Sequence, residues 1–301
     1  MKRFKIAVQL FGHLRTFEQC APKLYQHLLK NYDIDVFMHT WDKIDHNTAT
    51  WHKYKIKNMD ISSEILQQKV LSMYDLKDMQ METQVVEDLG FYDSCSFKMS
   101  IFGVQSALYS MRQVNQLRKS YQERQGIEYD FVLMIRPDIL LKEPFDFDAF
   151  FKKLTKEDIN TGLFTSGRDI TLIRNDLRFV VGLDVLFFSR ATVMDAIIES
   201  NSNIVETIQK NPKLPQFGVD YLFAKHVVDS GFSCYFIDYR LDKHCQILRG
   251  GTNKLSKRFF TIHVRKKYTE LFFFPCISRV FRIQLRFGYF YYIDIRIGCF
   301  D

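Results

Sequence analysis

The chain has 301 residues, 47% of them hydrophobic and 26% charged, which is long enough for one large domain and typical of a globular protein. Its six cysteines form no CxxC pair, which argues against a zinc cluster and fits a reducing compartment. The net charge is +7, and neither a signal peptide nor an uncharged stretch of about 20 residues stands out, so we expect a cytoplasmic protein without a membrane-spanning helix.

Strands and helices alternate along the first 240 residues. Short apolar runs predict strands at 5–10, 35–40, 129–135, 162–165, 180–188 and 232–238. Apolar residues at helical spacing predict helices at 22–30, 97–123, 191–209 and 217–230. For the long helix we expect a cap at Ser94 or Ser96 and an end at Gly126. This alternation favours an α/β fold with a mostly parallel sheet.

The first candidate binding site is the turn that follows the first strand. Ligands of open α/β sheets bind at the carboxyl ends of the strands. Gly12 would let the backbone approach a phosphate, and Arg15 would pair with a diphosphate through two hydrogen bonds. The alternative is an ordinary turn with a solvated arginine.

The second candidate site is the Arg-Pro-Asp triplet that ends the strand at 129–135. An aspartate at this position, Asp138, can hold a divalent cation against a nucleoside diphosphate, and Arg136 can assist in the same way. Pro137 fixes the backbone of the turn. The alternative is that Asp138 only caps a turn or a helix. We favour the functional interpretation, because two charged residues follow so apolar a run.

Four sequence blocks resemble bacterial glycosyltransferases of lipopolysaccharide and capsule synthesis with a GT-A-like fold. They are IAVQLFGHLRTF at 6–17, DVFMHTWD at 35–42, YDFVLMIRPD at 129–138 and DVLFFS at 184–189. The resemblance implies a Rossmann-like nucleotide-binding half, with Gly12 and Arg15 near a nucleotide-sugar donor. It places Asp138 where these enzymes keep an Asp-x-Asp metal motif.

The chain departs from that metal motif, because Arg136 stands two residues before Asp138 in place of an acid. A Mn²⁺ or Mg²⁺ cofactor at Asp138 is therefore one expectation, and partial replacement of the cation by Arg136 is the other. Literal Asp-x-Asp triplets occur at 33–35 and 146–148, and we favour neither as the metal site.

An inverting transferase needs a carboxylate that takes the proton of the acceptor hydroxyl. Asp184, at the edge of an apolar strand, and Asp220, in the first turn of a helix, are the two candidates, with a turn residue and a helix-dipole partner as the respective alternatives. Trp41 would stack on a base or sugar ring, unless it is a core residue. His13 and His39 are further candidates to line the donor pocket.

The segment 254–301 holds the entire net charge, since its ten basic residues face three acids and the rest of the chain is balanced. The same segment is rich in aromatic residues, which are interleaved with these charges. This combination suits the headgroup layer of an anionic membrane. Packing against the core and binding of single-stranded nucleic acid are the alternatives. We divide the chain into a domain at 1–253 and a basic, aromatic appendage at 254–301.

The sequence predicts a glycosyltransferase that extends a lipopolysaccharide or capsule glycan from a nucleotide-sugar donor. We expect a lipid-linked acceptor, a peripheral position on the inner membrane and no nucleic-acid partner. The competing hypothesis is a non-catalytic protein of the same fold that only binds glycan or nucleotide.

Overall fold

The computed structural model describes residues 4–45, 61–85, 87–94, 97–167, 171–172, 185–210, 219–241, 243–248, 280–287 and 291–298. The chain divides into two compact units, Met1–Gly251 and Thr252–Asp301. The predicted candidate Asp184 lies outside the described residues.

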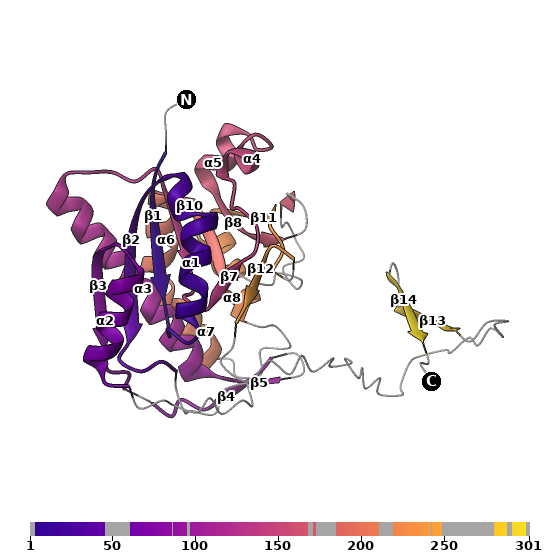
Figure 1. Cartoon of the computed structure of the whole chain (residues 1–301). Coiled ribbons are helices and arrows are strands. Elements are labelled where there is room, and N and C mark those ends of the chain that lie inside the picture. The colour runs from indigo at the N-terminus through magenta and orange to yellow at the C-terminus, as the bar shows by residue number, and fades with distance from the viewer. Residues whose placement is uncertain are drawn as a thin grey trace. The chain divides into compact units, whose positions relative to one another are not determined.

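The first unit is built on an eight-stranded sheet (Figure 1) with the strand order β3-β2-β1-β6-β10-β8-β11-β9. The strands are β1 (Lys5–Phe11), β2 (Asp33–Trp41), β3 (Leu76–Glu82), β6 (Phe131–Ile135), β8 (Gly162–Gly167), β9 (Thr171–Leu172), β10 (Leu186–Arg190) and β11 (Ser233–Asp238). Strand β10 is antiparallel to both of its neighbours and β9 is antiparallel to β11, whereas all other pairs are parallel. The predicted α/β fold with a mostly parallel sheet is confirmed.

Helices cover both faces of this sheet. One face packs against α1 (Phe17–His27), α2 (Ser63–Met73) and α4 (Phe147–Phe151). The other face packs against α3 (Ile101–Gln125), α6 (Ala191–Glu199), α7 (Ser202–Lys210) and α8 (Val219–Asp229). Alternate residues of β6 enter the two cores, and all five are buried, which is why this strand reads as a continuous apolar run.

Shorter elements connect this framework. The 3-10 helix η1 (Leu29–Asn31) follows α1, and α5 (Lys156–Thr161) precedes β8. Strand β7 (Ile139–Leu141) pairs with β12 (Cys245–Ile247) in a separate two-stranded sheet. Strands β4 (Phe91–Ser94) and β5 (Phe97–Ser100) form a hairpin just before α3.

Three predicted helix boundaries were wrong. The long helix α3 begins at Ile101 because the four preceding residues pair in β5, and its cap is Ser100, whose hydroxyl accepts from the Gly103 N–H at 3.3 Å. Helix α1 begins five residues before Pro22, so that the proline lies inside the helix. The predicted helix at 191–209 is two helices, which the buried Asn201 separates while its side chain contacts the Leu108 carbonyl.

The second unit contains an antiparallel hairpin of β13 (Val280–Phe287) and β14 (Tyr291–Gly298). Among the described residues of both units, no helix combines the length and the apolarity that crossing a bilayer requires.

We predict that Gly162→Ala destabilises the first unit by about 1–3 kcal/mol, because overpacking of a tight core has this cost. An added Cβ would lie 2.5 Å from the Asp158 carbonyl oxygen and 2.7 Å from the Phe164 ring, at the point where β8 begins. Urea unfolding measures the change.

Gly103→Ala in helix α3 is the matched control. Its Cβ would approach no atom closer than 3.7 Å, to Ser100, so we expect a gain of about 0.5–1 kcal/mol from helix propensity. Equal stability of the two variants would contradict the packing described for β8.

Candidate functional site

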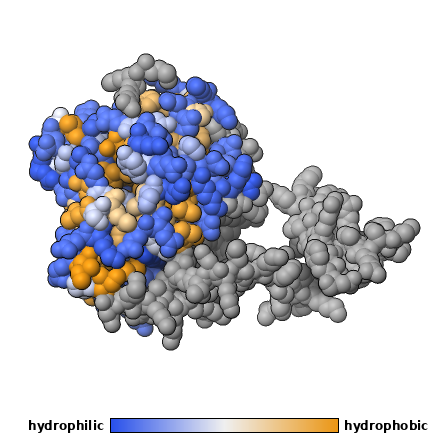
Figure 2. Space-filling view, viewed as in Figure 1, coloured by the Kyte–Doolittle hydropathy of each residue, from blue (hydrophilic) through white to orange (hydrophobic). Residues whose placement is uncertain are grey.

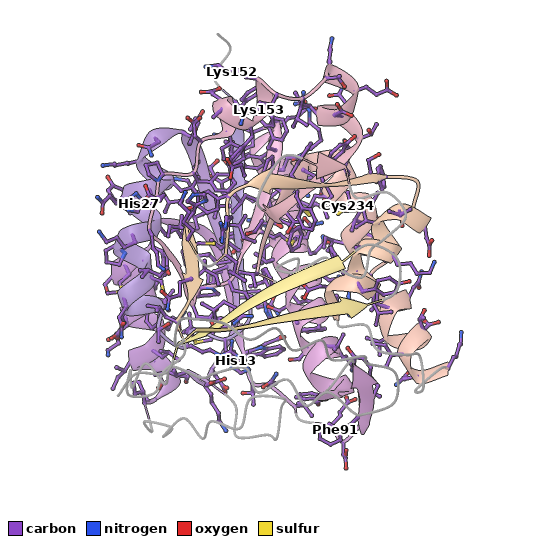
Figure 3. All side chains as sticks on the ribbon, turned by 90° about the vertical axis from the view of Figure 1, so that its right-hand side faces the viewer. His13, His27, Phe91, Lys152, Lys153 and Cys234 are labelled. Carbon is purple, nitrogen blue, oxygen red and sulfur yellow. The ribbon has the colours of Figure 1, made fainter. Side chains whose placement is uncertain are left out.

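The carboxyl ends of β1, β2 and β6 lie at one edge of the sheet, because these three strands are parallel. The chain moves from β1 to β2 and β3 on one side and later returns to β6 on the other side of β1. This reversal is a topological switch point, where open α/β sheets bind ligands. His13, which follows β1, lies at the end of the first unit that holds the carboxyl ends of these strands, and Lys152 and Lys153 lie at the opposite end (Figure 3).

The turn after β1 has an unusual backbone. Gly12 has a φ of 90°, and its N–H donates to the Ser110 hydroxyl of α3 at 2.7 Å. Arg15 has a φ of 46° and is the one residue other than glycine with a positive φ in the described part of the chain. Its N–H donates to the Ile44 carbonyl at 2.9 Å, which holds the turn against the segment after β2. A conformation of this kind costs on the order of 1–3 kcal/mol and concentrates at functional sites.

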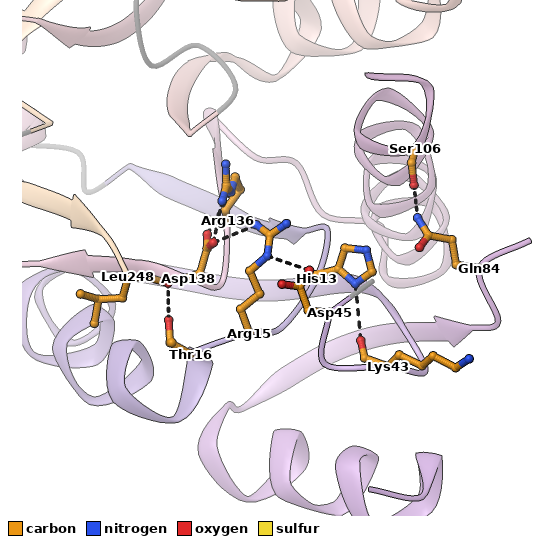
Figure 4. Close-up of polar contacts among 10 residues, drawn as sticks. All are labelled: His13, Arg15, Thr16, Lys43, Asp45, Gln84, Ser106, Arg136, Asp138 and Leu248. Atoms are coloured by element: carbon orange, nitrogen blue, oxygen red, sulfur yellow. Dashed lines mark hydrogen bonds and ion pairs between the residues drawn. The ribbon is translucent and has the colours of Figure 1, made fainter. Parts of the chain in front are cut away.

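Asp138 joins the turn after β1 to the turn after β6 (Figure 4). The Arg15 Nη1 donates to Asp138 Oδ2 at 2.9 Å. Arg136 donates to both oxygens of the same carboxylate, from Nε at 2.9 Å and from Nη2 at 2.6 Å. The predicted residues Arg15, Arg136 and Asp138 therefore meet at one point, although 123 positions separate Arg15 from Asp138.

A fourth member of this cluster, Asp45, was missed by the sequence analysis. The Arg15 Nε donates to Asp45 Oδ1 at 3.1 Å, so that Arg15 bridges two carboxylates. Asp138 is completely buried, while the side chains of Arg15 and Arg136 are 12% and 11% exposed. The buried carboxylate is therefore paired with two arginines that are themselves only slightly exposed. Because Asp45 follows β2 in a polar stretch without a motif, only its contact with Arg15 reveals it.

Leu248, near the end of the first unit, is hydrogen-bonded to the two turns that carry the cluster. The Leu248 N–H donates to the Asp138 carbonyl at 2.8 Å, and the Thr16 hydroxyl donates to the Leu248 carbonyl at 2.8 Å (Figure 4). Leu248 thereby spans the turns after β1 and β6. Neither Thr16 nor Leu248 carried a sequence signal, since both contacts depend on the backbone of a distant residue.

His39 is buried on β2 and holds the Gly12 turn through Ser110. Its Nδ1 lies 2.8 Å from the Ser110 hydroxyl, and its Nε2 lies 3.1 Å from Glu82 Oε1. Burial lowers the pKa of His39, although Glu82 opposes this shift. The neutral ring then donates from Nε2 to Glu82 and accepts at Nδ1 from Ser110, whose oxygen accepts from Gly12. His39 therefore positions the turn.

Trp41 lies at the end of β2 in a group of aromatic rings. Its indole stacks on the Tyr109 ring with 5.8 Å between centroids and an interplanar angle of 19°, and the His13 ring lies 6.3 Å away. Trp41 is only 6% exposed, so its stacking partner in the described structure is Tyr109. His13 also approaches the Lys43 carbonyl, at 3.5 Å from Nδ1.

The predicted catalytic aspartates are not part of the described cluster. Asp184 is outside the described residues, while the next residue, Val185, accepts from the Arg136 N–H at 3.1 Å. Asp220 lies in the first turn of α8. This helix leads into β11 and packs on it, so its first turn faces the carboxyl edge of the sheet that also carries Arg15 and Asp138.

The donor set around Asp138 does not fit a divalent cation in this arrangement. Both of its oxygens accept from guanidinium groups, which repel a further cation. Within the described ranges, no three His, Cys, Asp or Glu side chains are grouped as metal ligands. Of the literal Asp-x-Asp triplets, Asp35 accepts from the Tyr129 hydroxyl and Asp146 caps α4. The metal at Asp138 stays a prediction.

Residues 1–157 match a family model described as Domain of unknown function (DUF7796). The chain belongs to this family. The matched DUF7796 region is more than half of the chain and includes β1, β2 and β6 with Arg15, Asp45, Arg136 and Asp138. No curated protein matches the chain.

We predict that the free energy of unfolding decreases as the solution is acidified below about pH 7, and that His39 causes part of this decrease. The folded state lowers the pKa of His39 below its ordinary value of 6.5, so the unfolded chain binds more protons in the window below that value. His39→Asn, whose amide can still accept from Ser110, should show a smaller loss of unfolding free energy between pH 7.5 and pH 5.5. Denaturant unfolding at both pH values checks this, and an unchanged loss would contradict the neutral buried ring.

Proposed function

We propose that the chain is a glycosyltransferase that moves a sugar from a nucleotide-sugar donor to a growing lipopolysaccharide or capsule glycan. The observation that carries this proposal is the convergence of Arg15 and Arg136 on Asp138 at the topological switch point. Three of the four sequence blocks that resemble GT-A-like transferases overlap β1, β2 and β6, whose carboxyl ends carry this site.

The two arginines suit a diphosphate. A guanidinium group has five N–H donors in a planar fork that pairs with phosphate oxygens. The described contacts of Arg15 use its Nε and one N–H of Nη1, which leaves three donors for a ligand. Asp138 holds both guanidinium planes from the buried side, so that they are oriented before the donor binds.

Charge stabilisation is the chemical role that we assign to these arginines. When the glycosidic bond to the donor phosphate breaks, negative charge grows on the departing nucleoside diphosphate. Arg15 and Arg136 offset this charge from a largely buried position, where the interaction is stronger than in water. No step in this scheme requires a cation at Asp138.

The acceptor hydroxyl must lose its proton as it attacks the sugar. A carboxylate base is needed for this step in an inverting reaction. Asp220 supplies one at the carboxyl edge of the sheet, and Asp184 precedes the residue that contacts Arg136. We assign the base to one of these two aspartates. The acceptor in this proposal is a lipid-linked glycan at the cytoplasmic face of the inner membrane.

The second candidate function is non-catalytic binding of a nucleotide or glycan. The observation that favours it is that both oxygens of Asp138, which the resemblance places at the position of the metal-binding acid, accept hydrogen bonds from arginines. Release of sugar from a donor distinguishes an enzyme from a binding protein.

We predict that a nucleoside diphosphate or its sugar conjugate binds the chain and raises its melting temperature. Arg136→Lys should weaken this binding by about 10- to 100-fold, because a charge-assisted hydrogen bond contributes about 1.5–3 kcal/mol and lysine lacks the planar fork. Calorimetric titration with UDP, GDP, CDP and CMP measures the effect.

The matched control is Arg124→Lys, since Arg124 is an exposed arginine at the far end of α3 that pairs with Asp78. Its affinity should equal that of the unaltered chain. Equal affinities for the Arg136 and Arg124 variants, with both folded, would contradict the proposed site. Binding without sugar release in the presence of acceptor would favour the non-catalytic function.

A further inference from the structure

The hairpin of β13 and β14 has two chemically different faces. Neighbouring residues of a strand lie on opposite faces, and cross-strand partners share a face. By the register of the hairpin, the following pairs share what we call the apolar face: Phe281 with Ile297, Ile283 with Ile295, Leu285 with Ile293, and Phe287 with Tyr291. Every position on this face is therefore aliphatic or aromatic.

The opposite face, which we call the basic face, carries three arginines. Its pairs are Val280 with Gly298, Arg282 with Arg296, Gln284 with Asp294, and Arg286 with Tyr292. Two arginines placed directly opposite one another repel and destabilise an isolated hairpin. A neighbouring anion would relieve this repulsion.

A hairpin of two strands is only marginally stable alone in water. The hairpin belongs to the second unit. An apolar face of this kind is stable in water only when it is covered, and an arginine pair is stabilised by nearby negative charge, of which this face has one acid, Asp294. An anionic lipid bilayer supplies both, because the acyl boundary is apolar and the headgroups carry phosphate.

The first unit differs from the hairpin in its net charge and in the distribution of its exposed apolar residues. Outside the segment 254–301 the charges of the chain balance, whereas that segment carries +7. The described surface of the first unit exposes seven large apolar residues that lie on several elements, and the face in Figure 2 is mostly hydrophilic with separate apolar areas. Such scattered residues are normal for a protein surface. The excess of positive charge, which complements an anionic surface, is thus confined to the segment 254–301.

We propose that the hairpin at 280–298 docks the protein on an anionic lipid bilayer. In this proposal the face of the hairpin with only aliphatic and aromatic positions lies at the boundary between headgroups and acyl chains, and the three arginine positions lie at the level of the headgroups. Docking is independent of whether the site transfers a sugar.

The test is co-sedimentation of the full chain with vesicles of phosphatidylcholine alone or with phosphatidylglycerol added. We expect binding to the anionic vesicles that decreases with salt, and weak binding to the neutral vesicles. Replacing Arg282, Arg286 and Arg296 by Gln should lower binding by about fivefold per arginine, or about 100-fold in total. Equal binding to both kinds of vesicle would overturn the electrostatic part of the proposal.

Two cross-strand pairs provide a matched comparison of the faces. Ile283→Ser with Ile295→Ser alters the apolar face, and we expect it to lower binding by about 100-fold or more. Gln284→Ser with Asp294→Ser alters the neighbouring pair on the basic face, removes one acid and should bind as tightly as the unaltered chain or more tightly. Similar binding of both double variants would overturn the assignment of the apolar face.

The same variants distinguish the lipid bilayer from two other binding partners of the hairpin, a second copy of the chain and RNA. If the chain self-associates without lipid and the Ile283/Ile295 variant is monomeric, the apolar face joins two copies and the proposal is wrong. If RNA binds more tightly than the anionic vesicles, the segment is a nucleic-acid contact and the proposal is also wrong. Thermal unfolding of each variant confirms that the first unit is intact.

Discussion

The ion pairs of Asp138 with Arg15 and Arg136 are the constraint on which the candidate site depends. A carboxylate without exposure to solvent is costly to bury unless cationic donors satisfy it, and removing one partner of a buried pair costs about 3–5 kcal/mol. Because Arg15 follows β1 and Arg136 follows β6, this requirement ties together the two strand ends of the switch point. The left-handed backbone of Arg15 and the hydrogen bond from Leu248 to the Asp138 carbonyl lie at the same two strand ends.

This arrangement adds a second interpretation to the one that the resemblance implied for Asp138. The resemblance implies an acid that holds a metal ion against the donor phosphates. In the structure the acid pairs with two guanidinium groups, and in the proposed function these groups neutralise the departing diphosphate. A buried carboxylate and a strained turn also cost stability, which favours a functional reason for keeping them.

The sequence predicted the strands of the sheet core better than the surrounding elements. Strand β6 reads as a continuous apolar run because it is buried on both faces, and its end marked Arg136 and Asp138 correctly as neighbours of Arg15. The start of α3 was misplaced because the pairing of β5 with β4 is a tertiary contact that overrides local helical spacing. Asp45 was not predicted, since it joins the cluster through a tertiary contact with Arg15, which lies 30 positions earlier in the chain.

We propose that Arg15 and Arg136 form a preorganised site for the diphosphate of a nucleotide. A crystal structure of the full chain with the nucleoside diphosphate that binds most tightly tests it most directly. We expect the diphosphate at the carboxyl ends of β1 and β6, with its oxygens within hydrogen-bond distance of both guanidinium groups. A nucleotide bound elsewhere, with both arginines still turned only to Asp138 and Asp45, would show that the cluster is a structural ion pair.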